Sequence, residues 1–155
     1  MFKKILNNKT SQKRSFLMSK TKKNKMSKKI NINQINGKQI IVFFLCMLNT
    51  IKLYHWKTSS YSQHKATDSL YESLNSHIDK FIEVYLGKNS RVDLSKMKSI
   101  PLNDFNSLNE LKKNIINYKN FLISMSLPPE DSDLLTIRDE LLIDLNQFLY
   151  LLTLQ

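Results

Sequence analysis

The sequence predicts an all-α protein, a bundle of four helices that follows a basic tail. Its 155 residues are suited to a single domain, and an apolar fraction of 41% is enough for one core. Only two glycines and three prolines occur in the whole chain, so few breaks interrupt its helical stretches. We therefore expect residues 39–155 to fold as one four-helix bundle.

The first helix is expected over residues 38–57. Its apolar residues run without interruption from Ile40 to Leu48, which is too short a run for the about 20 residues that span a bilayer. No small-residue cleavage site follows, so the run does not match a signal peptide. We expect a helix that is apolar nearly all round and buried against more than one neighbour, with no membrane partner; a membrane anchor is the alternative.

The only cysteine of the chain, Cys46, lies within this apolar run. A single cysteine excludes an internal disulfide and a zinc site built from cysteines. We expect Cys46 to be a small buried core residue of a protein from a reducing compartment.

The second helix is expected to start with Ser60 or Ser62 as its cap and to end at Leu86, before Gly87. At about 100° per residue, its polar side chains fall within an arc of roughly 100° beside the apolar stripe, and His77 points away from that arc. The polar arc holds His64, Asp68, Glu72, Asp79 and Glu83, and the apolar stripe holds Leu70, Leu74, Ile78, Phe81 and Tyr85.

Two further helices are expected over residues 104–125 and from Asp131 or Ser132 to Leu152. Ser107 with Glu110 forms a potential capping box, and Asp104 is an equal candidate for the cap. Apolar residues recur in both segments at steps of three, four or seven, as in the seam of a bundle. They are Leu108, Leu111, Ile115, Tyr118, Leu122 and Met125 in the third helix, and Leu134, Leu141, Leu145, Phe148 and Leu152 in the fourth.

The lengths of the connections predict the topology. Short loops join the first helix to the second and the third to the fourth, which favours two antiparallel hairpins. Residues 88–103 are long enough when extended, at roughly 50 Å, to pass along a whole helix. We therefore predict a long crossover that makes helices two and three parallel; an up-and-down bundle with short loops is the alternative.

The first 38 residues differ from the rest of the chain. They contain twelve Lys or Arg and no acidic residue, so they account for the formal net charge of +11. Their isolated apolar residues follow no steady period, which predicts a disordered tail over residues 1–38. Such a tail binds nucleic acid phosphates by counterion release, or alternatively only adds solubility. The residues expected to bind nucleic acid are Lys13, Arg14, Lys20, Lys22, Lys23, Lys25, Lys28 and Lys29.

One cluster of side chains is suited to metal chemistry. His55, His64, Asp68, Asp79 and Glu83 lie within 29 residues, and two of the gaps are four residues, which stacks each pair on one helix face. Carboxylates with imidazoles are suited to iron, so iron is the expected metal. We expect no catalytic residue separate from these ligands. The alternative is a solvated helix face, with His55 and Trp56 as a packing pair at a helix end.

These residues resemble the Dps-type ferritins, the mini-ferritins that protect DNA in starved cells. In that family a His-Trp-Asn motif closes the first helix, a His-x-x-x-Asp pair opens the second, and an Asp-x-x-x-Glu pair follows. Here the matching residues are His55-Trp56, then His64 with Asp68, and Asp79 with Glu83, with eleven residues from Asp68 to Asp79. The chain is also similar to uncharacterised ferritin-like proteins of bacteria and large DNA viruses. It departs from the Dps pattern at Lys57, which replaces the asparagine, and in a shorter gap between His55 and His64.

The resemblance implies a homo-oligomer in which iron is oxidised between subunits. His55, His64 and Asp68 would come from one subunit, and Asp79 and Glu83 from a two-fold mate, which makes the protein a ferroxidase candidate. The basic tail would hold nucleic acid, in the cytoplasm or nucleoid, or in a virion or host nucleus if the protein is viral. The alternative is a ferritin-like structural or packaging protein without enzymatic activity, whose tail binds DNA or another acidic partner.

Overall fold

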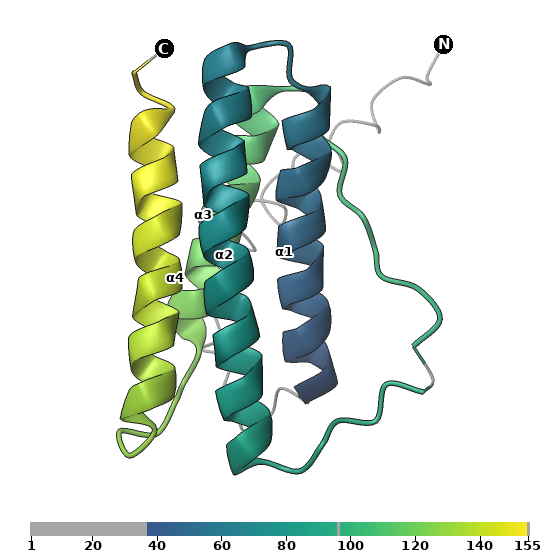
Figure 1. The fold of residues 1–155 in the computed structure, drawn as a ribbon, viewed down its shortest axis with the longest axis vertical. Helices are drawn as coiled ribbons and strands as arrows, with labels where there is room; N and C mark the ends of the chain where they lie inside the picture. Colours follow the sequence, from purple (N-terminus) through teal and green to yellow (C-terminus); the bar gives the residue numbers. More distant parts are fainter. Residues whose placement is uncertain (1–36, 96, 155) are drawn as a thin grey trace, which may run out of the picture.

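The computed structural model describes residues 37–95 and 97–154, and within them it contains four helices and no strand. This confirms the predicted all-α class and the number of helices. The predicted disorder of the tail concerns residues that lie almost entirely outside the described ones, so it stays a prediction. The helices are α1 (Gly37–Lys57), α2 (Tyr61–Lys88), α3 (Leu108–Ser124) and α4 (Ser132–Leu151), as Figure 1 shows.

A single core holds apolar side chains from all four helices. Phe44, Phe81 and Phe148 are among its largest fully buried members, and each contributes roughly 1.5–3 kcal/mol through burial. Of the side chains predicted to point inward from the last three helices, only Tyr85 and Leu108 are half-buried, and all the others are buried. The predicted apolar stripes therefore identify the core of the bundle.

Helix α1 is covered by more than one neighbour, as its apolar sequence predicts. Beyond its packing on α2, the ring of Phe43 stacks on Phe121 of α3 with 3.6 Å between ring centroids. The hydroxyl of Tyr118 on α3 donates to Thr50 Oγ1 on α1 over 2.9 Å, inside the core. By length and composition α1 is also the one helix of the described part that could cross a membrane, and just over half of its apolar window is buried in the bundle.

Polar contacts at both ends of α4 show how the helices run. At its start, Lys88 at the end of α2 contacts Asp131 and Asp133, at 2.8 and 2.7 Å. At its other end, the Leu152 carbonyl accepts a hydrogen bond of 3.2 Å from Lys112, which lies in the first turns of α3. Helix α4 therefore runs antiparallel to both α2 and α3.

The connection between α2 and α3 contacts both ends of α1. Near its beginning Val92 sits beside Gly37, the first residue of α1, and near its end Asp104 bonds Lys57, the last residue of α1, over 2.6 Å. Figure 1 shows the segment returning beside α1 to the end of the bundle where α3 starts. The assignment to the ferritin-like class of bundles stays a prediction.

Three predicted details were wrong, each for a local physical reason. Helix α2 continues through Gly87 to Lys88, because Asn89 N–H still reaches the Tyr85 carbonyl at 3.0 Å and caps the last turn. Helix α3 starts at Leu108 instead of residue 104; the Ser107 side chain accepts from Glu110 N–H at 3.3 Å, which confirms Ser107 over Asp104 as the cap. Cys46 is half-buried and not a core residue, and its thiol donates to the Pro101 carbonyl over 2.9 Å.

Candidate metal centre

The turn between α1 and α2 is held by side chains from both helices. Ser60 caps α2 by accepting from Gln63 N–H at 3.4 Å, which confirms one of the two predicted caps. The Gln63 side-chain oxygen accepts from the Tyr54 hydroxyl at 2.8 Å and from the Thr58 hydroxyl at 2.9 Å. Since Tyr54 and Thr58 lie at the end of α1 and just after it, these bonds fix where α2 starts relative to α1.

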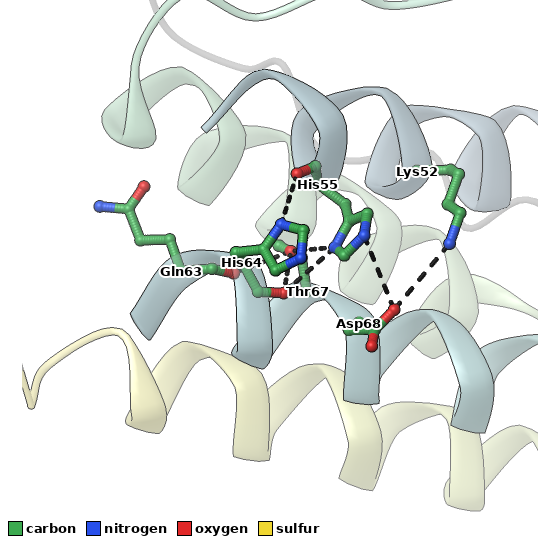
Figure 2. Close-up of polar contacts among 6 residues, drawn as sticks. All are labelled: Lys52, His55, Gln63, His64, Thr67 and Asp68. Atoms are coloured by element: carbon green, nitrogen blue, oxygen red, sulfur yellow. Dashed lines mark hydrogen bonds and ion pairs between the residues drawn. The ribbon is translucent and has the colours of Figure 1, made fainter. Parts of the chain in front are cut away.

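This turn brings two histidines face to face. His55 Nδ1 lies 3.1 Å from the His64 carbonyl oxygen, and His64 Nδ1 lies 3.1 Å from the His55 carbonyl oxygen. A carbonyl oxygen can only accept, so both Nδ1 atoms carry hydrogen and donate. The rings stack with 3.9 Å between centroids and 25° between planes (Figure 2). When such a ring is neutral, its Nε2 atom keeps the lone pair that can bind a metal ion.

Thr67 also contacts the His55 ring and helps to fix its position. Its side chain is fully buried, and His55 itself is only 6% exposed. The Thr67 hydroxyl donates to the carbonyl oxygens of Gln63 and His64, at 2.8 and 3.0 Å, and lies 3.3 Å from His55 Nδ1. The His55 Nδ1 hydrogen is thus shared between two oxygen atoms of α2, and the ring has one defined orientation.

The Asp68 carboxylate faces the other nitrogen of His55. Its Oδ1 atom lies 3.7 Å from His55 Nε2 and 3.9 Å from Lys52 Nζ, as Figure 2 shows. The Lys52 ammonium also lies 4.5 Å from the centre of the Tyr71 ring, a cation–π contact. The structure therefore brings together the three candidates assigned to one subunit, His55, His64 and Asp68, and adds a lysine that the sequence did not suggest.

The other two metal candidates lie far from this cluster. Asp79 and Glu83 are exposed on α2, and Asp79 is eleven residues beyond Asp68, or about 16 Å along the axis at 1.5 Å per residue. Across residues 37–95 and 97–154, no group of three or more His, Cys, Asp or Glu side chains is arranged to hold a metal ion. His55, His64 and Asp68 are therefore close together but do not by themselves form such a group. The nucleic-acid-binding candidates, Lys13 to Lys29, lie outside the described residues.

A second polar cluster lies between α2 and α4, around His77. Its Nδ1 lies 2.7 Å from Asp144 Oδ2, and its Nε2 lies 3.8 Å from Glu140 Oε2, which is also 3.8 Å from Lys80 Nζ. His77 thus faces α4 and not the metal candidates, as its position on the helical wheel predicts. Sequence reasoning did not select Asp144 or Glu140, although their spacing of four residues places both on one face of α4.

A comparison with protein families gives one match, to residues 55–152, described as "Family of unknown function (DUF5856)". The chain belongs to this family. The DUF5856 range starts at His55, contains all five metal candidates, and leaves out the basic tail and most of α1. No curated protein and no solved structure matches the chain. The likeness to Dps-type and other ferritin-like proteins therefore depends on the residues of this chain alone.

Proposed function

We propose that the protein is a ferritin-like iron-oxidising protein that binds Fe(II) between two subunits and nucleic acid through its basic tail. The observation that carries this proposal is the reciprocal bonding of His55 and His64. Histidines that bind metals usually donate their other ring nitrogen to a carboxylate or carbonyl, which fixes the tautomer and the ring direction. Both histidines of the candidate site have this arrangement.

The donor set is suited to Fe(II). Two imidazoles and the Asp68 carboxylate resemble the ligand types that non-haem iron prefers, and at least one position is left for the exchange of oxygen ligands. His55 Nε2 and Asp68 Oδ1 are separated by 3.7 Å, so a small closing movement would bring both into contact with one ion. The donor chemistry of these residues therefore fits iron as a bound substrate.

A second subunit would supply the remaining carboxylates. Asp79 and Glu83 are exposed, and neither forms an ion pair or hydrogen bond with another described residue. In a two-fold dimer, every contact occurs twice: if a residue of the first chain contacts a second residue of its partner, the same two residues also meet with the chains exchanged. A two-fold axis near the middle of α2 would thus bring Asp79 and Glu83 of each chain to the histidines of the other, and would form two sites.

The proposed reaction is the oxidation of Fe(II) by hydrogen peroxide. Each Fe(II) gives up one electron, and one peroxide accepts two electrons and two protons and leaves as two waters. The carboxylates stabilise the Fe(III) product, because hard oxygen ligands prefer the higher charge. The tail would keep the assembly on nucleic acid, with an affinity that falls steeply as salt rises.

A second candidate is a ferritin-like structural or packaging protein that does not bind iron. It is favoured by Lys52, whose ammonium lies 3.9 Å from Asp68 and lowers the attraction of that carboxylate for a cation. In this alternative, the histidine pair only links α1 to α2, and the tail alone carries the function. The two candidates differ in whether Fe(II) binds and whether the chain forms oligomers.

Anaerobic Fe(II) titration calorimetry, Fe(III) formation after addition of peroxide, and sedimentation velocity together test the proposal. We expect stoichiometric Fe(II) binding by an oligomer, with affinity reduced at least tenfold by Asp79→Asn combined with Glu83→Gln. The matched control is Glu130→Gln, an exposed carboxylate between α3 and α4, which should leave binding unchanged.

Lys52→Gln should tighten Fe(II) binding severalfold, because it removes a cation beside Asp68. A monomer that shows no Fe(II)-dependent heat would overturn the iron proposal and leave the structural one.

A further inference from the structure

The polar cluster between α2 and α4 holds the His77 ring between two carboxylates. His77 Nδ1 lies 2.7 Å from Asp144 Oδ2, and because an ionised carboxylate can only accept, Nδ1 donates to it. The other ring nitrogen, Nε2, lies 3.8 Å from Glu140 Oε2. Each nitrogen of the ring therefore faces an oxygen of α4, the first at hydrogen-bond distance and the second beyond it.

Glu140 Oε2 is a buried oxygen atom that accepts no hydrogen bond. Within residues 37–95 and 97–154 it is the only buried side-chain nitrogen or oxygen atom in this condition. The two groups that face it, His77 Nε2 and Lys80 Nζ, both lie 3.8 Å away. Since a buried polar atom without a partner costs free energy, this oxygen is expected to have a further ligand.

The distance across this gap is suited to a metal ion. Two ligands that lie 2.0–2.2 Å from a tetrahedral zinc ion are about 3.4 Å apart. His77 Nε2 and Glu140 Oε2 reach this separation if they approach each other by about 0.4 Å. The bond from Nδ1 to Asp144 supports the same role, because histidines that bind zinc usually donate their other ring nitrogen to a carboxylate or carbonyl.

We propose that His77 Nε2 and Glu140 Oε2 bind a zinc ion that links α2 to α4, with Asp144 as a positioning residue. Imidazole and carboxylate are both zinc ligands. The site has two protein ligands and not three, so water completes the coordination, and side chains that are 28% and 35% exposed leave room for it. Lys80 is 61% exposed, so its ammonium can move into solvent as the ion binds. The site shares no residue with the iron candidates.

Zinc titration of the full chain against a chromogenic chelator, together with thermal unfolding, tests the proposal. Zinc should raise the Tm, because a ligand bound only by the folded state stabilises it. His77→Asn keeps an amide donor for Asp144 but removes Nε2, and it should weaken zinc binding by more than about tenfold, as should Glu140→Gln. The matched control is Asp139→Asn, an exposed carboxylate next to Glu140, which should leave zinc binding unchanged.

The role of Asp144 has its own variant. Asp144→Asn keeps an oxygen acceptor for His77 Nδ1 but removes the negative charge that makes the ring a stronger ligand, and it should weaken zinc binding by about tenfold. Lys80→Met should tighten zinc binding severalfold, because it removes a competing cation beside Glu140. If neither variant changes the zinc affinity, the ion does not lie in this cluster and the proposal is overturned.

A further comparison separates this site from the histidine pair. His55→Asn should leave the zinc affinity of the His77 cluster unchanged. Loss of zinc binding in His55→Asn but not in His77→Asn would assign the ion to the histidine pair and overturn the proposal. A chain whose Tm does not rise with zinc would also overturn it, and would identify the cluster as ion pairs alone. The iron proposal is tested independently, through Asp79 and Glu83.

Discussion

His55 and His64 each place Nδ1 3.1 Å from the backbone carbonyl oxygen of the other residue, with their rings stacked between. The relationship joins the last turn of α1 to the first turn of α2 and fixes one tautomer in both rings. The Nδ1 atoms link the two helices, whereas the Nε2 atoms stay available for chemistry. Amide substitutions can separate the two roles, because the amide nitrogen of asparagine occupies nearly the place of Nδ1.

His55→Asn should therefore keep most of the stability and lose iron binding. The asparagine amide can still donate to the His64 carbonyl, whereas His55→Ala removes the donor from a buried site and should cost about 1–3 kcal/mol of unfolding free energy. Urea unfolding measures the first effect and anaerobic Fe(II) titration the second. If His55→Asn binds Fe(II) like the unmodified chain, His55 Nε2 is not a ligand and the pair only links the two helices.

The two glycines of the chain should respond to alanine in opposite directions. A Cβ at Gly37 would lie 2.7 Å from Val92 Cγ2 and 3.0 Å from the Tyr85 ring, so Gly37→Ala forces these side chains to shift and should cost about 1–3 kcal/mol. At Gly87, inside α2, no such atom lies within 4 Å, and Gly87→Ala should stabilise by up to about 1 kcal/mol.

Thermal unfolding of both glycine variants checks this prediction, with each acting as the control for the other. Equal shifts in the same direction would mean that helix propensity alone decides, and that Val92 does not pack on α1 in solution. A loss at Gly37 with a gain at Gly87 would support the contact between the connection and the start of α1.

The sequence predicted the helices and most of the core because both depend on local periodicity. The stripe from Leu70 to Phe81 and the seam from Leu111 to Met125 follow from helix geometry alone. The end of α2 was missed because a glycine inside a helix costs only about 1 kcal/mol, which the packing of the last turn can offset. The start of α3 was missed because the Asp104 carboxylate bonds Lys57, a contact between residues distant in the sequence.

Helix geometry also predicted part of the arrangement of the candidate residues, whereas their role as a metal site stays a prediction. Spacing placed His64 and Asp68 on one face of α2 and excluded His77 from it. It could not show that His55 meets His64 through backbone carbonyls, because that contact depends on the three-residue turn between α1 and α2. Nor could it show Lys52 beside Asp68, because a lysine in an apolar helix gives no signal of what it faces across the bundle.

The hydrogen bond between Tyr118 and Thr50 should matter for stability. It is buried between α1 and α3, over 2.9 Å, and Tyr118→Phe would leave the Thr50 hydroxyl without this partner. We expect a loss of about 1 kcal/mol of unfolding free energy in urea. Tyr150→Phe is the matched control, since that ring is 62% exposed, and it should change the free energy by less than about 0.5 kcal/mol. Equal effects of the two changes would contradict the buried bond.

The ion pairs that join the end of α2 to the start of α4 should make stability depend on pH. Bonds to Asp131 and Asp133 raise the pKa of Lys88, and the bond from Lys88 lowers the pKa of Asp133 below its usual 3.8. The contribution of Asp133 is therefore present above its unfolded pKa and is lost as pH falls through the lower folded value. The contribution of Lys88 to stability is present below the unfolded pKa of Lys88. It is lost only when the pH rises through the raised pKa of the folded state, under strongly alkaline conditions.

The contribution of these ion pairs to the unfolding free energy should therefore be constant between about pH 5 and pH 9. It should fall at lower and at higher pH. Lys88→Met removes the cation and should make the acid side shallower, because the bond from Lys88 is the largest cause of the lowered pKa of Asp133. Urea unfolding from pH 2 to pH 7 measures the slope, and Lys113→Met, an exposed lysine of α3, is the control. Equal acid slopes in both variants would mean that Lys88 does not pair with Asp133 in solution. This pair joins the end of α2 to the start of α4. Without it, only core packing would stabilise that end of the bundle.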